Sequence, residues 1–276
     1  MKKLSRLIER LGRTVRVSKP ATALLGRQFQ PAVDLIEIDI TFACNLRCFN
    51  CDRSCTQAPS GERMNVEQVR RFVDESRAQG RRWKRIRILG GEPTLHPELQ
   101  AILSVLLSWR DSESPDTLIE LVTNGHGDRV RRVLEQLPEG VRIKDTRKQE
   151  RFQPKFEPFN LAPRDEVWLR HADYSNACWI VRDCGIGLNA NGYYPCAVAG
   201  GIDRVIGRDL GRKRLPLPGE DMTELLRESC SRCGHFLAGR FVAVEDRVPV
   251  VGERQSSSWR EAYERYRKSP PRLTRY

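Results

Sequence analysis

Apolar and polar positions along the first half of the chain follow two alternating periods. The short period is clearest at residues 33–40, where three isoleucines fall on one side and two acidic residues on the other. A period of two is typical of a strand, and apolar positions three or four residues apart are typical of an amphipathic helix. The predicted strands are 33–40, 86–89, 118–122 and 141–144.

Three helices are predicted between these strands. Asn65 followed by Gln68 resembles a capping box, and Gly80 marks the end of that helix. Pro97 suits the first turn of the second helix, and Asp128 can cap the third. Strands that alternate with helices pair in parallel through right-handed crossovers. The pattern therefore predicts an α/β sheet, either open or rolled into a partial barrel.

Composition and the placement of charge narrow the class of protein. The chain has 276 residues and a formal net charge of +12. Eight basic residues and one acidic residue lie in 1–31, and seven basic and three acidic residues lie in 253–276, which leaves the middle close to neutral. A nucleic-acid-binding core would need a basic face of its own, so none is expected. The basic ends, including a helix predicted over 2–13, could contact an anionic surface.

No apolar run is long enough to cross a bilayer, and basic residues interrupt every N-terminal stretch that could serve as a signal peptide. We therefore expect a cytoplasmic protein. Its nine cysteines favour metal ligation over disulfides, because cytosolic thiols are kept reduced. They form two groups, Cys44 to Cys55 and Cys178 to Cys233.

The first group begins with Cys44, Cys48 and Cys51, a C-x3-C-x2-C motif directly after the first strand. Three thiolates can hold three irons of a cubane cluster and leave the fourth iron open to another ligand. The alternative is a structural zinc site with Cys55 as fourth ligand, although such sites usually pair cysteines as C-x2-C.

The chain resembles the radical SAM superfamily in three motifs at three successive predicted strand ends. The cysteine motif reads CNLRCFNC, the second strand ends in GGEP, and the third ends in Thr-Asn-Gly. The resemblance covers residues 32–150 and implies a partial (β/α) barrel with a [4Fe–4S] cluster. In that family the open iron binds S-adenosylmethionine, whose reductive cleavage gives a 5'-deoxyadenosyl radical that takes a hydrogen atom from the substrate.

The resemblance also implies which residues contact the cofactor. The expected positions are the aromatic residue of the cysteine motif and the two other strand ends, namely Phe49, Gly90, Gly91, Glu92, Pro93, Thr123 and Asn124. One basic residue after the fourth strand, Lys144, Arg147 or Lys148, could pair with the methionine carboxylate. A tight turn at GGEP and a solvated basic loop are the alternative interpretations.

The second cysteine group surrounds a predicted hairpin with Asn191-Gly192 in its turn, because Asn-Gly is the strongest short hairpin signal. The hairpin would bring its flanking cysteines together, and a C-x2-C pair follows later. This arrangement resembles the twitch region, a shortened SPASM-like region that holds an auxiliary iron–sulfur cluster after the barrel. A zinc ribbon is the alternative. The four predicted ligands are Cys184, Cys196, Cys230 and Cys233, and His235 could replace one of them or lie in an exposed loop.

Cys55 and Cys178 are left over. Each is either a small buried residue or a hydrogen-atom donor, as in some radical SAM epimerases. The predicted organisation is a basic extension over 1–31, a partial barrel over 32–177, an auxiliary-cluster region over 178–240, and a C-terminal helix and tail over 241–276.

Three functional hypotheses follow. The first is a radical SAM enzyme that oxidises or rearranges a small anionic or sugar-like metabolite. The second is a maturase that modifies a ribosomal peptide, and the third is a non-catalytic iron–sulfur scaffold or regulatory protein. The enzyme hypotheses imply a reducing partner such as flavodoxin or ferredoxin, and a small-molecule or peptide substrate.

Overall fold

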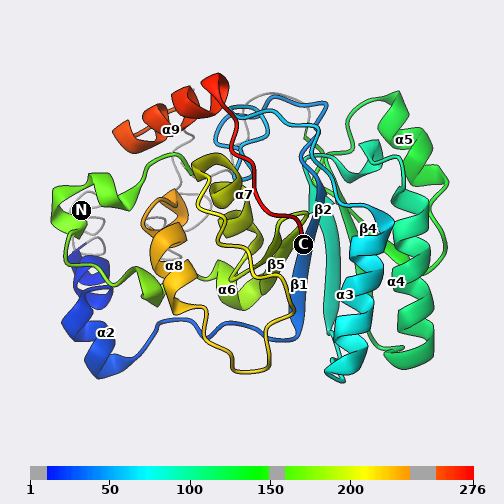
Figure 1. Ribbon diagram of the computed structural model, residues 1–276, viewed down its shortest axis with the longest axis horizontal. Coiled ribbons are helices and arrows are strands. Elements are labelled where there is room, and N and C mark those ends of the chain that lie inside the picture. The colour runs from blue at the N-terminus through cyan, green and yellow to red at the C-terminus, as the bar shows by residue number, and fades with distance from the viewer. Residues whose placement is uncertain (1–10, 149–158, 237–252) are drawn as a thin grey trace, which may run out of the picture.

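The computed structural model describes residues 11–148, 159–236 and 253–276. A six-stranded sheet with the order β4-β3-β2-β1-β5-β6 runs through the middle of the protein (Figure 1). Its first five strands in chain order pair in parallel, and β6 returns antiparallel to β5. The strands are β1 (Leu35–Thr41), β2 (Arg85–Gly90), β3 (Leu118–Thr123), β4 (Val141–Asp145), β5 (Ile186–Asn189) and β6 (Gly192–Tyr194). The predicted α/β class and all four predicted strands are confirmed.

Three helices connect the first four strands and cover one side of the sheet, on the right in Figure 1. They are α3 (Val66–Ala78), α4 (Leu99–Glu113) and α5 (Asp128–Glu135). The isoleucines of β1 pack there against Phe72 of α3 and Leu103 of α4 in one hydrophobic core. Burial of this apolar face provides the main stabilisation of the helix layer.

Local sequence signals set the helix ends, with two differences from the prediction. The capping box of Asn65 and Gln68 is present at α3, and Gly80 follows its end with φ +59°. The N-cap of α5 is Gly127, and Asp128 is the first helical residue. At α4 the turn that contains Pro97 precedes the helix, whose N-cap is Glu98.

The other face of the sheet carries buried charges. Glu37, Arg87, Glu120 and Arg142 stand opposite one another on β1, β2, β3 and β4, and we call them the charged row. Arg87 Nη1 lies 2.7 Å from Glu37 Oε1, and Arg87 Nε lies 2.6 Å from Glu120 Oε1. Arg142 pairs with Glu120 at the end of the row. The two faces of β1 are therefore both buried, one among apolar side chains and the other among ion pairs.

The second half of the chain packs on the left of Figure 1 around a second hydrophobic core. Its α-helices are α6 (Ile180–Asp183), α7 (Ala197–Ile206), α8 (Thr223–Cys230) and α9 (Ser257–Lys268), and α2 (Lys19–Leu25) lies below them in Figure 1. Five short 3-10 helices are η1 (Pro93–Leu95), η2 (Pro163–Asp165), η3 (Val167–Leu169), η4 (Tyr174–Asn176) and η5 (Gly234–Phe236).

The predicted hairpin exists, but its turn lies one residue earlier than predicted. Asn189 pairs with Gly192, so Ala190 and Asn191 form the turn and Gly192 begins β6. The hairpin also joins the main sheet, because Ile36 and Ile38 of β1 pair with β5. The region predicted to hold the auxiliary cluster is thus continuous with the parallel sheet.

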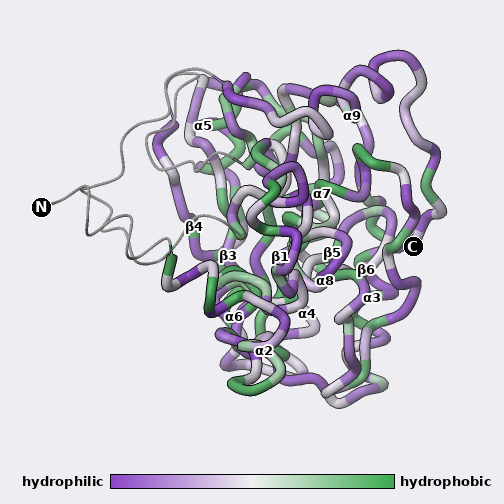
Figure 2. The backbone as a smooth tube through the Cα atoms, turned by 90° about the vertical axis from the view of Figure 1, so that its left-hand side faces the viewer, coloured by the Kyte–Doolittle hydropathy of each residue, from purple (hydrophilic) through white to green (hydrophobic). Residues whose placement is uncertain are grey.

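The C-terminal helix packs on its own protein, as predicted. Trp259, Tyr263 and Tyr266 of α9 are buried in the second core, whereas the rest of α9 appears as a mostly hydrophilic peripheral segment in Figure 2. Most of the helix predicted over 2–13 lies outside the described residues. Within the described part of the chain, no helix combines the length and apolarity needed to cross a bilayer.

Candidate metal and cofactor site

The three sequence motifs meet at one cavity beyond the carboxyl ends of β1, β2 and β3. Its volume is about 40 Å³, and it opens toward solvent. The lining residues come from the cysteine loop, from the end of β2 and from the segments after β3 and β4. They are Cys44, Leu46, Cys48, Cys51, Asp52, Cys55, Thr56, Gly90, Gly91, Asn124 and Lys148.

The two glycines allow the ends of β1 and β2 to approach closely. A Cβ atom on Gly90 would lie 2.2 Å from Thr41 O, and one on Gly91 would lie 2.3 Å from Ala43 O. Gly91 N donates a hydrogen bond to Thr41 O at 2.8 Å. The absence of side chains is therefore required by the neighbouring backbone.

Glu92 does not line the cavity, although the sequence placed it at the cofactor. Its side chain is fully buried, and Oε1 accepts hydrogen bonds from Thr94 N, Thr94 Oγ1 and Thr123 Oγ1. Oε2 accepts a hydrogen bond from Asn124 N at 2.7 Å. Glu92 thus ties the end of β2 to the end of β3. Pro93 and Thr123 are also buried behind the cavity wall.

Asn124 connects the third strand end to the cysteine loop. Its Nδ2 donates to Asn45 Oδ1 at 2.8 Å and lies 3.9 Å from Cys44 Sγ. Asn45 Nδ2 in turn donates to His126 O at 2.7 Å. These contacts fix the loop that carries the first cysteine. The sequence motif gave Asn124, but only the fold reveals Asn45 as its partner.

Of the three basic candidates, Lys148 is the one that lines the cavity. Its backbone N donates to Asn124 O at 2.9 Å, which holds it beside the third strand end. Lys144 on β4 and Arg147 are exposed and do not line the cavity, and the same is true of the half-buried Phe49.

The thiols of the first group differ in acidity. A hydrogen bond from the Cys55 thiol lowers the pKa of Cys51 to about 7, and burial raises the pKa of Cys44 to about 11. Cys55 therefore has a partner, Cys51, within the same cavity. Among the residues described, no three His, Cys, Asp or Glu side chains are grouped as one metal ion would require. A cubane differs in this respect, because each cysteine binds a separate iron.

Asp52 and Arg53 follow Cys51 and were missed by the sequence analysis. Burial would raise the pKa of Asp52, but the charges of Arg53, His235 and Lys148 outweigh it and lower that pKa. Arg53 is 6% exposed and forms ion pairs of 3.1 Å with Glu37 and Asp39 of β1. No local pattern marks these two residues, since their partners come from distant parts of the chain.

Comparison with known proteins finds a match for the part of the chain that carries the motifs. Residues 38–144 match the model of the radical SAM superfamily, and they include the cysteine loop and both other motifs. This part of the chain is therefore a radical SAM domain, of the family that uses a [4Fe–4S] cluster and S-adenosylmethionine.

Relatives with assigned names align with only part of the chain. A probable GTP 3',8-cyclase of Methanococcus maripaludis is 33% identical over 100 residues, which cover 36% of this chain and 30% of that protein. The GTP 3',8-cyclase of Nautilia profundicola is 29% identical over 105 residues, 37% of this chain and 31% of the relative. The chain therefore spans less than a third of the length of these relatives.

Among solved structures, BtrN in complex with AdoMet and 2-DOIA is similar at 14% identity and a TM-score of 0.42, covering 74% of this chain and 94% of BtrN. BtrN in an open conformation is similar at 13% identity and a TM-score of 0.37, covering 75% of this chain and 89% of BtrN.

The residues present fit the radical SAM cluster. Cys44, Cys48 and Cys51 share one cavity wall, and thiolates are the ligands that iron–sulfur clusters prefer. The cavity also contains Lys148, a cation suited to a carboxylate. At the glycine pair, the Gly91 N–H already donates a hydrogen bond to Thr41 of β1. The backbone carbonyls of Gly90 and Gly91 are the groups there that could accept a hydrogen bond from an ammonium.

The second cysteine group gathers in the second core. Burial raises the pKa of Cys230 well above its usual range, and nearby Cys178 and Cys196 raise it further. The pKa of Cys233 is raised by burial and by Cys178, Cys230 and Cys196. These four thiols lie near one another in the second core, next to α6, α7, α8 and η5.

Cys184 packs against the edge of the same core. It ends α6, and burial together with a hydrogen bond to the Glu37 carboxylate raises its pKa. Its thiol thus faces the charged row, whereas the thiols that act on Cys230 and Cys233 include that of Cys178. His235 is 8% exposed, so the exposed-loop interpretation of this histidine is wrong.

Proposed function

We propose that this protein reductively cleaves S-adenosylmethionine at a [4Fe–4S] cluster held by Cys44, Cys48 and Cys51. The observation that carries the proposal is the shared cavity, where these thiols stand beside the glycine pair and Lys148. When bound, the cluster supplies the electron that converts S-adenosylmethionine into a 5'-deoxyadenosyl radical and methionine. Hydrogen-atom abstraction from the substrate is the chemistry that this radical would supply.

The residues of the chain position the cofactor in this proposal. Carbonyls at Gly90 and Gly91 accept from the methionine ammonium, and the Lys148 ammonium pairs with its carboxylate. Asn124 holds the cysteine loop through Asn45. Glu92 acts indirectly, because its carboxylate is buried and holds the strand ends together.

We further propose that Cys178, Cys196, Cys230 and Cys233 hold an auxiliary cluster. The support is their mutual proximity and burial, while Cys184 interacts with Glu37. Four thiolates also suit zinc, and metal analysis separates the two. In this proposal Cys178 is a cluster ligand and not a hydrogen-atom donor. Cys55, whose thiol is hydrogen-bonded to Cys51, is not proposed as a hydrogen-atom donor either.

We propose a small anionic metabolite as substrate. Two relatives that align with part of this chain are named GTP 3',8-cyclase, so GTP is the first compound to assay. Other nucleoside triphosphates and the sugar-like metabolites are alternatives within this class. A cytoplasmic location and a flavodoxin or ferredoxin partner stay predictions.

The first experiment measures iron and cofactor cleavage in the anaerobically reconstituted protein. Two clusters correspond to about eight irons per chain. Cys44→Ala, Cys48→Ala and Cys51→Ala combined should remove about half of the iron and abolish 5'-deoxyadenosine formation with dithionite. Cleavage that persists in the triple variant would contradict the assignment of the first cluster.

A second experiment tests the ligand set of the auxiliary site. Cys178→Ala should lower the iron content toward about four per chain, whereas Cys184→Ala, the matched control, should leave it unchanged. The opposite result would restore the ligand set predicted from the sequence. Stoichiometric zinc at this site would rule out the auxiliary cluster.

A further inference from the structure

The loop that follows Cys51 packs directly against the helix that follows Cys196. A Cβ atom on Gly201 of α7 would lie 3.1 Å from Asp52 O, so a side chain at this position would push the two segments apart by a few tenths of an ångström. Arg204, one turn further along α7, donates from Nη2 to Arg53 O at 2.9 Å and from Nη1 to Ala58 O at 2.8 Å. The two cysteine sites are therefore held against each other by buried contacts.

A side-chain contact also links the two cysteine sites. Asp52 is bonded covalently to Cys51 and lines the first cavity. Its Oδ2 lies 3.9 Å from Nε2 of His235, which follows Cys233 by two residues and is 8% exposed. The same oxygen lies 3.1 Å from Arg53 Nη1. The Asp52 carboxylate thus lies between Cys51 of the first site and His235 beside the second.

We propose that the Asp52–His235 contact couples the two cysteine sites, so that the charge state of one alters the reduction potential of the other. This inference rests on the proposed function. Reduction adds negative charge to a cluster, and a carboxylate close by opposes it, more strongly in a buried place than in water. Coupling between two sites is reciprocal, so reduction of either cluster should lower the potential of the other by the same free energy. Asp52 and His235 are positioning residues, and neither is proposed as a ligand.

The test is a redox titration of the full chain, reconstituted anaerobically and followed by electron paramagnetic resonance, which reports each cluster separately. Asp52→Asn keeps the shape and removes the charge. It should raise the potentials of both clusters. His235→Gln, made beside the second site, should shift the potential of the first, because it replaces the group that faces the Asp52 carboxylate. The double variant should differ from the sum of the single effects.

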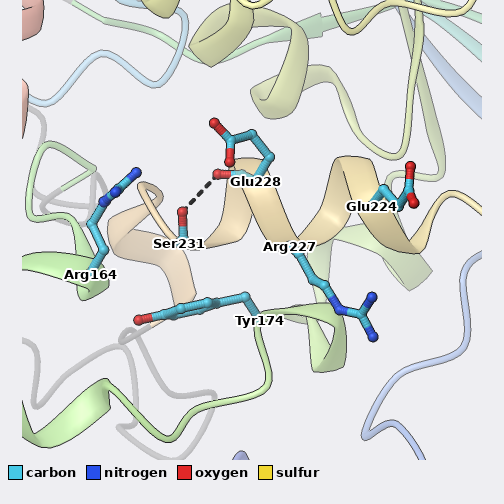
Figure 3. Close-up of a pocket in the computed structure, with 6 residues that line it drawn as sticks. All are labelled: Arg164, Tyr174, Glu224, Arg227, Glu228 and Ser231. Atoms are coloured by element: carbon cyan, nitrogen blue, oxygen red, sulfur yellow. Dashed lines mark hydrogen bonds between the residues drawn. The ribbon is translucent and has the colours of Figure 1, made fainter.

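Glu224→Gln is the matched control for loss of a carboxylate. Glu224 is exposed in the first turn of α8, the helix that ends at Cys230. Figure 3 shows it at the far end of that helix from Ser231, with its carboxylate away from Arg227 and Tyr174. It should leave both potentials unchanged.

The outcomes separate the two proposals. If the unaltered protein holds only one cluster or binds zinc, the proposed auxiliary cluster fails and the inference fails with it. If it holds two clusters but Asp52→Asn and His235→Gln each shift the nearer potential alone, or the shifts are additive, only the inference is overturned. Should Asp52→Asn lose iron, the effect of His235→Gln on the first cluster still decides the question.

Discussion

Replacing Glu92 by Gln tests the strand-end connection most directly. The carboxylate is fully buried and accepts four hydrogen bonds from three residues. A glutamine keeps the shape but turns one acceptor into an NH2 group. In its least unfavourable orientation the nitrogen faces Asn124 N, so two donors oppose each other in a buried place. An unsatisfied buried donor costs about 1–3 kcal/mol, and the lost charge weakens the remaining bonds, which gives a destabilisation of about 2–4 kcal/mol.

The assay is thermal unfolding of the metal-free chain, followed by circular dichroism. For a chain of this size, each kcal/mol lowers Tm by about 2–4 °C, so a decrease of about 5–15 °C is expected. Glu98→Gln is the matched control, because Glu98 lies on the same connection and makes no side-chain cap hydrogen bond to α4. It should change stability by less than about 0.5 kcal/mol. A Glu92→Gln variant as stable as this control would refute the strand-end role.

Three further predictions concern stability. Gly91→Ala should destabilise the fold and weaken S-adenosylmethionine binding measured by calorimetry, because the new Cβ would lie 2.3 Å from Ala43 O; a neutral effect would contradict the required close approach. Asn65→Ala should cost about 1 kcal/mol in chemical denaturation through loss of the α3 cap, and an unchanged midpoint would count against it. Asp165→Asn should destabilise the protein because Asp165 accepts hydrogen bonds from Ser258 N and Oγ in the first turn of α9. Burial opposes ionisation of Asp165, but the serine hydrogen bonds outweigh it and lower its pKa. This stabilisation is therefore present above about pH 4 and is lost as the pH falls through the pKa of Asp165 in the folded protein. A difference in stability between variant and parent that persists at low pH would contradict it.

Local signals made the first half of the fold predictable. Strand alternation, the capping box at Asn65 and the glycine after α3 depend on neighbours in sequence, so the sequence contains them. The burial of both faces of β1 was not predictable in the same way, because Glu37 meets its partners Arg53 and Arg87 only after the chain has folded. For the same reason the hydrogen bonds of Glu92 were not predictable, because its carboxylate accepts from Thr123 of β3 and from Asn124.

The cysteine site was predictable as far as its motifs extend. The spacing of Cys44, Cys48 and Cys51 and the strand-end motifs identified the cavity, yet Asp52, Leu46 and Thr56 were found only in the structure. In the second group, the hairpin signal favoured Cys184 because that residue precedes β5. The single turn of α6 directs Cys184 toward Glu37, and a fold-level contact brings Cys178 to the other thiols.

The charged row constrains the register of the strands. Hydrophobic alternation repeats every two residues, so apolar packing alone would tolerate a strand displaced by two positions. Glu37, Arg87, Glu120 and Arg142 alternate in sign across four strands and lie opposite one another in one file. Sliding β2 by two in one direction would place Leu89 opposite Glu37 and Glu120 and leave both buried carboxylates without a guanidinium, a heavy penalty away from water, whereas the opposite slip would place Arg85 there. The ion pairs therefore oppose slippage in one direction, and in doing so they help to keep the loops above the sheet level with one another.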